Sequence, residues 1–362
     1  MNIWIDICHT PQLNFYKPII RVLSDKNYRV LVTVLRRGKL PEITMKELED
    51  YKNVDVTIIG RHRMKKWSVI IEANLMRIIW MIFWAIGKKI DVVLCNHQAA
   101  IVARILGFPG YTFGDDPEVK VYPLFVKAAT QSHTLIYEDT TNGKILPKDK
   151  VMPCLKEWAY LNPRTFIPNL KALEKYGVKP KEYMFLREVT VGTINYAGQE
   201  SGAILGIKDM IPAGMKVLFS LEEKKRRNEY PEDWILLQEP IEDIHSLIYY
   251  AAGLVSSGDS MAREAALLGV PSYYLGIRYS MPANAAASKV ASLQNRKTMP
   301  FEEWIHEYIE DKPKKEITKN DHADEDVIEQ RMRQQDALRK HIDSEFIDIN
   351  AYMLELVEGV KE

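Results

Sequence analysis

Short apolar segments alternate with helical patterns along most of the chain, and this alternation restricts the fold more than any other feature. In the first part, segments rich in β-branched residues occupy residues 3–7, 29–35, 54–60, 91–96, 110–113 and 133–138. Continuous apolar strands separated by helices are typical of a parallel sheet that is covered on both faces. Residues 1–160 therefore predict a doubly wound α/β domain.

A second series of the same kind follows residues 154–169, where prolines and aromatic residues interrupt the pattern. Its apolar segments occupy residues 182–188, 215–220, 234–240, 253–257 and 272–276. We predict a second doubly wound domain over 161–315. Residues 316–362 are rich in charges without a strand pattern, so we expect a helical extension that packs back on the N-terminal domain. Ligands of such sheets bind at the carboxyl ends of the strands, and we expect both sets of ends to face one cleft.

The charge balance and the cysteines argue against several classes of protein. Lysine plus arginine and aspartate plus glutamate number 49 each, whereas a dedicated nucleic-acid-binding protein would normally be basic. Cys8, Cys95 and Cys154 are far apart, which fits a reducing compartment, and no His/Cys cluster has zinc-ligand spacing. The N-terminus shows no basic segment followed by an apolar one, so we expect a cytoplasmic protein without a secretion signal.

Residues 67–89 form a very apolar stretch. Glu72, Asn74 and Arg77 interrupt it, so we predict a long helix rather than a bilayer-spanning one. The stripe expected to face the core contains Ile71, Leu75, Ile78, Ile79, Ile82 and Ile86. A second stripe contains Met76, Trp80, Phe83 and Trp84, and the basic residues around it are Lys65, Lys66, Arg77, Lys88 and Lys89. Such a stripe suits peripheral contact with the anionic inner face of the cell membrane, and equally a helix buried on two sides or a homodimer contact.

The segment VSSGDSMAREAALLGVP, residues 255–271, leads from an apolar strand through a Ser/Gly/Asp turn into a short helix. Free N–H groups and the helix dipole at such a turn favour an anion such as a diphosphate, and Asp259 or Ser260 would cap the helix. Glu264, further along the helix, could accept hydrogen bonds from ribose hydroxyls. An ordinary capped helix would show the same pattern, and the turn lacks the G-x-G-x-x-G dinucleotide motif.

Several segments together resemble a known family. They are WIDICHTPQLNFYKPII (residues 4–20), GYTFGDDPEVKVYPLFVKAAT (110–130), KEWAYL (156–161) and SMAREAALLGVP (260–271). These segments are similar to the DUF354 family of archaeal and bacterial GT-B-like proteins. Residues 236–271 resemble the nucleotide-sugar half of GT-B glycosyltransferases and of UDP-N-acetylglucosamine 2-epimerases, and the whole resemblance spans residues 1 to about 290. It implies a GT-B fold, in which two Rossmann-like domains face a cleft, with C-terminal helices.

The resemblance assigns the nucleotide-sugar site to the second domain. It places the base beside Glu239 and Ile241 and the ribose on Glu264. The diphosphate would lie on the turn formed by Ser257, Gly258, Asp259, Ser260 and Met261. Arg187 ends the first strand of this domain, where GT-B proteins often use a basic residue for phosphate, although a solvated arginine would show the same pattern.

The resemblance also implies that the first domain holds the acceptor and the catalytic base. A histidine with its near-neutral pKa suits removal of a proton from the attacking hydroxyl, and His9 lies in the loop after the first strand. GT-B relatives often carry a histidine at the position of Gln12, and glutamine cannot act as a base. Thr10 and Gln12 belong to the same loop, and we expect them to contact the acceptor.

Two further loops are expected at the same place. Asn96 and His97 follow the fourth strand, and Asp115 and Asp116 follow the fifth. A carboxylate pair could act as a base or bind a metal, although Asp116 could equally cap the next helix. The candidate catalytic residues are therefore His9, His97 and Asp115, and Asn96 belongs with the acceptor loop.

These features together predict a metal-independent GT-B glycosyltransferase that uses no cofactor. It would transfer a sugar from a nucleotide-diphospho-sugar, expected to be UDP-linked, to a glycan or lipid-linked acceptor, as in polysaccharide biosynthesis. A non-hydrolysing 2-epimerase is the first alternative, and a non-catalytic sugar-nucleotide-binding protein is the second. Fold alone does not separate these functions.

Overall fold

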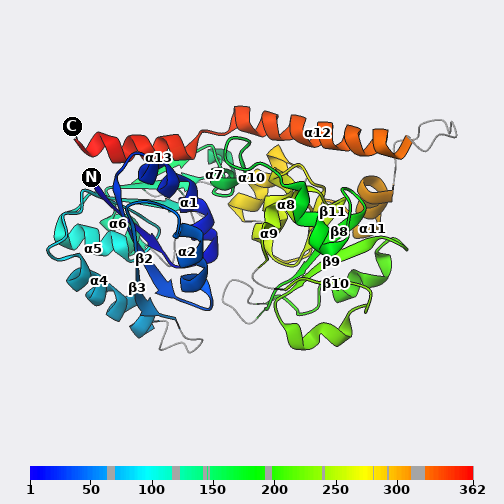
Figure 1. The fold of residues 1–362 in the computed structure, drawn as a ribbon, viewed down its shortest axis with the longest axis horizontal. Helices are drawn as coiled ribbons and strands as arrows, with labels where there is room; N and C mark the ends of the chain where they lie inside the picture. The colour runs from blue at the N-terminus through cyan, green and yellow to red at the C-terminus, as the bar shows by residue number, and fades with distance from the viewer. Residues whose placement is uncertain are drawn as a thin grey trace. The chain divides into compact units, whose positions relative to one another are not determined.

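The computed structural model describes residues 1–62, 70–115, 123–141, 145, 147–191, 198–238, 241–279, 281–291, 293–310 and 323–361. The chain forms two compact units: unit 1 comprises Met1–Tyr160 and Phe346–Glu362, and unit 2 comprises Leu161–Glu345 (Figure 1). The expected extension over 316–362 is divided between them. Helix α12 (Ala323–Glu345) belongs to unit 2, because its side chains bond to the backbone of that unit, and α13 (Ile349–Glu358) belongs to unit 1.

Unit 1 contains a parallel sheet of seven strands in the order β3-β2-β1-β4-β5-β6-β7. The strands are β1 (Asn2–Ile7), β2 (Arg29–Arg36), β3 (Val54–Arg61), β4 (Val92–Cys95), β5 (Gly110–Gly114), β6 (Gln131–Leu135) and β7 (Asp149–Met152). The helices besides α13 in the described part of this unit are α1 (Thr10–Asp25), α2 (Leu40–Leu48), η1 (Ile71–Met76), α4 (Arg77–Ala85), α5 (Ala99–Leu106), α6 (Pro123–Ala128), η2 (Glu138–Thr140) and η8 (Gly359–Lys361). The strand order reverses between β1 and β4, and open α/β sheets bind ligands at the carboxyl ends of strands at such a point.

Unit 2 contains a parallel sheet of six strands in the order β10-β9-β8-β11-β12-β13, with the reversal between β8 and β11. The strands are β8 (Tyr183–Glu188), β9 (Lys216–Leu221), β10 (Ile235–Leu236), β11 (Gly253–Ser256), β12 (Ser272–Tyr274) and β13 (Leu293–Asn295). Among the residues of this unit that the structure describes, the helices besides α12 are η3 (Leu170–Tyr176), η5 (Leu205–Met210), η6 (Lys224–Glu229), α8 (Ile244–Tyr249), α9 (Asp259–Leu267), α10 (Pro282–Val290), α11 (Phe301–Trp304) and η7 (Ile305–Glu310). Helix α7 (Trp158–Leu161) lies at the junction of the units.

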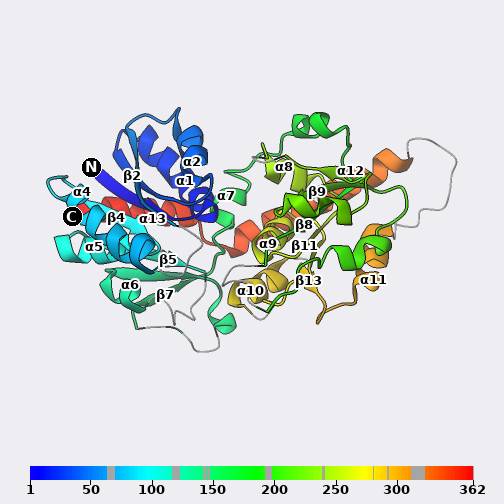
Figure 2. The same cartoon turned by 90° about the horizontal axis from the view of Figure 1, so that it is seen from below.

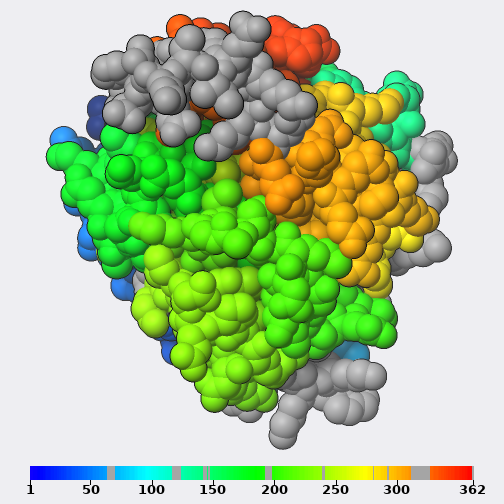
Figure 3. Space-filling view, turned by 90° about the vertical axis from the view of Figure 1, so that its right-hand side faces the viewer, coloured from blue at the N-terminus to red at the C-terminus, as the bar shows by residue number. Residues whose placement is uncertain are grey.

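Both sheets confirm the predicted α/β class and the doubly wound arrangement. Buried apolar residues explain this, since four of the six residues of β1 are buried and apolar. In unit 2, Phe219 of β9 and Trp304 of α11 belong to one hydrophobic core, and Figure 3 shows the orange α11–η7 region directly against green segments of the unit. The sequence does not reveal the edge strands β7 and β13, because they are short and carry polar residues.

The face that the helical segment η1–α4 turns to the core matches the expected one only in part. The buried stripe contains Ala73, Arg77, Met81 and Ala85. The exposed stripe contains Ile71, Leu75, Ile79, Trp80, Phe83 and Ile86, with exposed fractions between 36% and 71%. The predicted core stripe is therefore wrong for Ile71, Leu75, Ile79 and Ile86, because Arg77 turns inward to pair with Asp6 of β1. It is right for Ile78 and Ile82, which are partly buried and pack against the core. Trp84 is also not a surface residue of this stripe, since its ring packs 5.2 Å from that of Trp4.

The segment lies on the outside of unit 1, where α4 runs beside α5 (Figure 2). Across the described ranges, no helix is both long enough and apolar enough to cross a bilayer.

Candidate functional site

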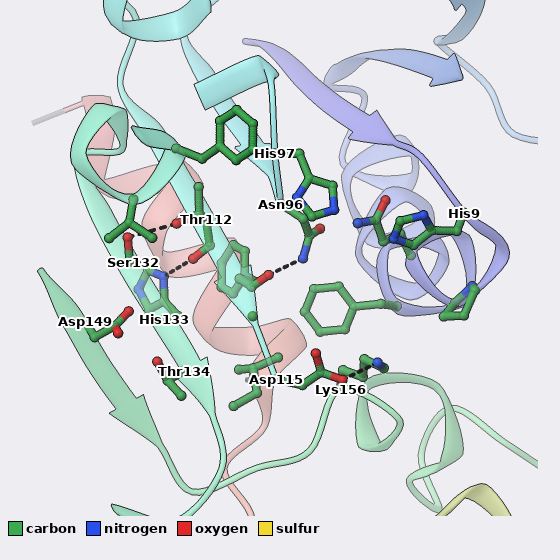
Figure 4. Close-up of a pocket in the computed structure, with 18 residues that line it drawn as sticks. His9, Asn96, His97, Thr112, Asp115, Ser132, His133, Thr134, Asp149 and Lys156 are labelled. Carbon is green, nitrogen blue, oxygen red and sulfur yellow. Dashed lines mark hydrogen bonds and ion pairs between the residues drawn. The ribbon is translucent and has the colours of Figure 1, made fainter. Parts of the chain in front are cut away.

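The reversal point of unit 1 contains a cavity of about 180 Å³ (Figure 4). Residues from the carboxyl ends of β1, β4 and β5, from α1 and α6, and from the neighbouring strand β6 line it. It brings together the predicted residues His9, Gln12, Asn96, His97 and Asp115. Its apolar wall includes Phe15, Phe113 and Phe125. Thr10, by contrast, is an exposed residue at the start of α1 and does not line the cavity.

A buried ion pair supports the loop that carries His9. The two terminal nitrogens of the Arg77 guanidinium donate to the Asp6 carboxylate, at 2.5 and 3.0 Å, and Arg77 Nε donates to the Ile59 carbonyl oxygen at 2.9 Å. Gly60 makes room for this side chain, since a Cβ there would lie 2.9 Å from Arg77 Cγ and Cδ and the residue has φ +77°. Sequence reasoning missed this pair, because nothing in a local pattern links β1 to η1–α4.

Gln12 fixes the backbone of the same loop. Its Oε1 accepts a hydrogen bond from the Cys8 backbone N–H at 2.7 Å. Cys8 itself is buried, and burial raises the pKa of its thiol to about 12, so that it remains a neutral thiol near pH 7. Gln12 thus holds the loop, and Cys8 is not a nucleophile.

The side chains of His9 and His97 both line the cavity, and their ring centroids lie 5.6 Å apart. Burial, helped by the neighbouring His97 and Arg37, lowers the pKa of His9 to about 3, and burial lowers that of His97 to about 4. The Arg37 guanidinium lies 3.2 Å from His9 Nδ1. Since a guanidinium can only donate, Nδ1 accepts and Nε2 carries the ring hydrogen. His9 in this tautomer is a hydrogen-bond donor, and a weak candidate for a base.

Asp115 and Asp149 are the carboxylates among the residues that line the cavity, and Lys156, a residue that the sequence patterns did not single out, pairs with Asp115. Both side chains are partly exposed, so a ligand can reach them. Asn96 is bonded on both sides: its Oδ1 accepts from the Tyr16 hydroxyl at 2.8 Å, and its amide nitrogen donates to the Phe113 carbonyl oxygen. Asp116 lies outside the described residues. Asp115 directly follows β5, at the carboxyl end of the sheet where the other predicted residues lie, whereas Asp149 begins β7.

In unit 2, the turn after β11 is fixed to β8 by hydrogen bonds. The Ser257 backbone N–H donates to the Arg187 carbonyl oxygen at 3.0 Å, and the Val189 N–H donates to Ser257 Oγ at 2.9 Å. Gly258, not Asp259 or Ser260, is the N-cap of α9, and no side chain caps the helix. The prediction that Asp259 or Ser260 caps α9 is therefore wrong, because the Asp259 carboxylate pairs with arginine side chains instead.

Asp259 joins a polar cluster at the N-terminus of α9. Its Oδ2 lies 3.2 Å from the guanidinium groups of both Arg263 and Arg278. Arg263 also donates to Asn284 Oδ1 at 2.7 Å, and Arg278 is the more exposed of the two arginines. Two cations face one carboxylate, so these three side chains carry a net positive charge. The position of Arg278, just after β12, was the available signal for it in the sequence.

The other predicted residues of unit 2 have defined positions. Glu264 is nearly buried on α9, and its Oε2 lies 3.6 Å from His245 Nε2 of α8. Arg187 bonds to Ser220 Oγ at 2.8 Å and to the Glu222 carboxylate, which ties it to β9. Ile241 is partly buried in the loop before α8, Ser260 and Met261 are partly exposed at the start of α9, and Glu239 lies outside the described residues. Within the described part of the chain, no group of three or more His, Cys, Asp or Glu side chains could hold a metal ion.

Comparison with known proteins establishes the fold. No family model matches the sequence, and no curated protein matches it. Similar solved structures include the UDP-GlcNAc 2-epimerase from Neisseria meningitidis bound to UDP-GlcNAc (12% identity, TM-score 0.62, 99% of each chain covered). They also include spinosyn rhamnosyltransferase SpnG with thymidine diphosphate (12%, 0.58, 99% of this chain and 100% of that one) and spinosyn forosaminyltransferase SpnP (13%, 0.61, 99% of each).

The chain has the GT-B fold. Likeness at this level of identity shows the fold and not the reaction. Membership of the DUF354 family stays a prediction.

Proposed function

We propose that the protein binds a nucleotide-diphospho-sugar, expected to be UDP-linked, through unit 2 and transfers the sugar to an acceptor hydroxyl bound by unit 1. The observation that carries the proposal is the cluster at the N-terminus of α9. Arg263 and Arg278 outnumber Asp259 there, which suits a diphosphate, and Glu264 on the same helix suits ribose hydroxyls.

The proposed chemistry needs no metal. The N-terminus of α9 and the Arg278 guanidinium would stabilise the negative charge that develops on the departing diphosphate. In unit 1, the Asp115 carboxylate would take the proton of the acceptor hydroxyl, whose oxygen forms the new bond to the anomeric carbon as the bond to the diphosphate breaks. Lys156 keeps this carboxylate oriented, and the neutral rings of His9 and His97 would donate hydrogen bonds to the acceptor.

Calorimetric titration with UDP, GDP, TDP and UDP-GlcNAc tests the donor site. We expect Glu264→Gln and Arg278→Gln each to weaken binding about tenfold, the effect of losing a hydrogen bond to a charged group. Glu232→Gln, at an exposed position of unit 2, is the control and should bind as the wild type does. A folded wild-type protein that binds none of these nucleotides contradicts the proposal.

A 2-epimerase is the second candidate, supported by the likeness to an epimerase structure that holds UDP-GlcNAc. The Asp115–Lys156 pair would then act on the proton at C2 of the sugar, and no acceptor would be needed. Incubation with UDP-GlcNAc in deuterium oxide separates the two, since only epimerisation brings solvent deuterium into C2. Tight binding with neither deuterium uptake nor transfer would instead leave the non-catalytic binding protein.

The exposed stripe on η1–α4 supports a lipid-linked acceptor and a peripheral membrane contact. A helix of a peripheral protein packs one face on its own domain and presents an exposed apolar face to the membrane surface. Lys88 and Lys89 follow the stripe and, together with Arg29, line a hollow at its end. Glu72, the one acidic residue within η1–α4, is paired with Arg61. The stripe is thus apolar with cations beside it, which complements an anionic lipid surface.

Co-sedimentation with vesicles containing anionic lipid tests this contact. We expect the wild type to sediment, and the double variant Ile79→Glu plus Phe83→Glu to remain in solution. Ile167→Glu is the matched control, because Ile167 is more exposed than either residue but lies in unit 2. If the wild type remains in solution and light scattering gives twice the chain mass, which the double variant halves, the stripe is a homodimer contact instead.

A further inference from the structure

Among the described residues, His245 is a neighbour of Glu264, the proposed ribose ligand, that the proposed function does not use. His245 lies in the first turn of α8, and its Nε2 is 3.6 Å from Glu264 Oε2. Both side chains are largely buried, at 18% and 10% exposed. The separation is slightly longer than a hydrogen bond, and such contacts often tighten when a ligand binds.

Helix α12 packs behind the His245 ring through one aromatic residue. Phe166 contacts the imidazole edge-on, with centroids 6.1 Å apart. The Arg339 guanidinium of α12 covers the Phe166 ring at 5.6 Å and donates to the carbonyl oxygens of Leu161 and Phe166, both at 3.1 Å. A planar guanidinium that is stacked and hydrogen-bonded holds an aromatic ring in one place. The position of the His245 ring therefore depends on α12.

The same helix also holds the ends of α8 and α9. Gln335 Nε2 donates to the Tyr249 carbonyl oxygen at the end of α8 at 3.0 Å, and Lys181 Nζ bonds to that oxygen at 3.0 Å and to Gln335 Oε1 at 2.7 Å. After α9, Gly269 lies so close that a Cβ would be 2.7 Å from Gln335 Cγ and 3.0 Å from its carbonyl oxygen. Since α8 carries His245 and α9 carries Glu264, α12 fixes the spacing of the two side chains.

We propose that His245 is a positioning residue of the nucleotide site, which orients the Glu264 carboxylate toward the ribose hydroxyls while α12 holds the His245 ring through Phe166 and Arg339. This inference rests on the proposed function of unit 2. A long carboxylate side chain has several rotamers, and a neighbour that selects one lowers the cost of binding. His245 then contributes to affinity only when the ligand carries the hydroxyls that Glu264 binds.

Nucleotides with and without ribose hydroxyls separate this role from a structural one. The probes are UDP, GDP and their 2′,3′-dideoxy analogues, titrated into the whole chain. We expect His245→Phe to weaken binding of the ribonucleotides about tenfold and to leave the dideoxy analogues within about twofold. His245→Gln, which keeps an amide near the position of Nε2, should restore most of the affinity. Thermal melting of each free variant shows whether it is folded.

The α12 connection is tested with Arg339→Lys, which keeps the charge and loses the planar stacked group. We expect a selective loss for the ribonucleotides, and no added loss when it is combined with His245→Phe. Arg333→Lys, on the exposed side of α12, is the control.

Equal losses for ribonucleotides and dideoxy analogues, or no loss in His245→Phe, overturn the inference. A folded wild type that binds no nucleotide overturns the proposed function itself and this inference with it.

Discussion

Gly269 permits the close packing of α12 against unit 2, and replacing it with alanine tests that contact. The residue has φ +75°, which L-residues rarely adopt, and the added Cβ would lie 3.0 Å from the Gln335 carbonyl oxygen and 3.1 Å from its Cα. These are backbone atoms, so a side-chain rotation cannot relieve the contact. Either α12 or the turn after α9 must move.

Two costs add in Gly269→Ala. The left-handed backbone conformation costs about 1–2 kcal/mol for an alanine, and overpacking against a fixed neighbour costs a further 1–3 kcal/mol or so. Gly214→Ala isolates the first cost, because Gly214 has φ +81° and nothing within 4 Å of the added Cβ. The free energy of unfolding, from urea titrations followed by tryptophan fluorescence, should therefore fall by roughly 1–3 kcal/mol more in Gly269→Ala than in Gly214→Ala. Equal losses in the two variants would refute the close packing of α12.

Two further predictions concern buried charges. Burial lowers the pKa of Lys181 from 10.5 to about 7, so between these values the unfolded chain binds more protons and stability rises with pH. In urea titrations, the wild type should gain about 2 kcal/mol relative to Lys181→Met between pH 7 and pH 9. A difference that does not change with pH counts against the burial of Lys181. Asp6→Asn leaves the Arg77 guanidinium buried without its counter-charge and should cost about 3–5 kcal/mol, while Asp55→Asn, in the exposed pair with Arg29, should cost less than about 1 kcal/mol. Similar losses in the two aspartate variants would contradict the pairing of Arg77.

The sequence predicts the fold class well because both sheets are built from continuous buried strands. Such strands leave an apolar pattern that needs no knowledge of their neighbours. The prediction of which face of α4 is buried fails because that face depends on a distant residue. The helix buries Arg77, whose partner Asp6 lies 71 residues away in the sequence. Any amphipathic analysis assigns an arginine to the surface, so the apolar stripe opposite it was assigned to the core.

The candidate site shows the same limit. The loops at the strand ends were predictable, and unit 1 does bring His9, His97 and Asp115 to one cavity. Their chemistry was not predictable, because burial and Arg37 set the pKa and tautomer of His9. Arg278 escaped notice because its contact with Asp259 exists only in the folded unit.

The ion pair between Asp6 and Arg77 has a consequence for how η1–α4 docks on the sheet of unit 1. Asp6 lies on the central strand β1, and its carboxylate is 1% exposed once the sheet forms. Asp6 shares a face of β1 with Trp4, because alternate side chains of a strand point the same way, and the Trp4 ring packs against Trp84 of α4. The segment η1–α4 therefore both covers the Asp6 carboxylate and supplies its partner. A docking position of this segment that did not bring Arg77 to Asp6 would bury the carboxylate unpaired, at a cost of several kcal/mol. The ion pair thus selects one register for the helix on the sheet.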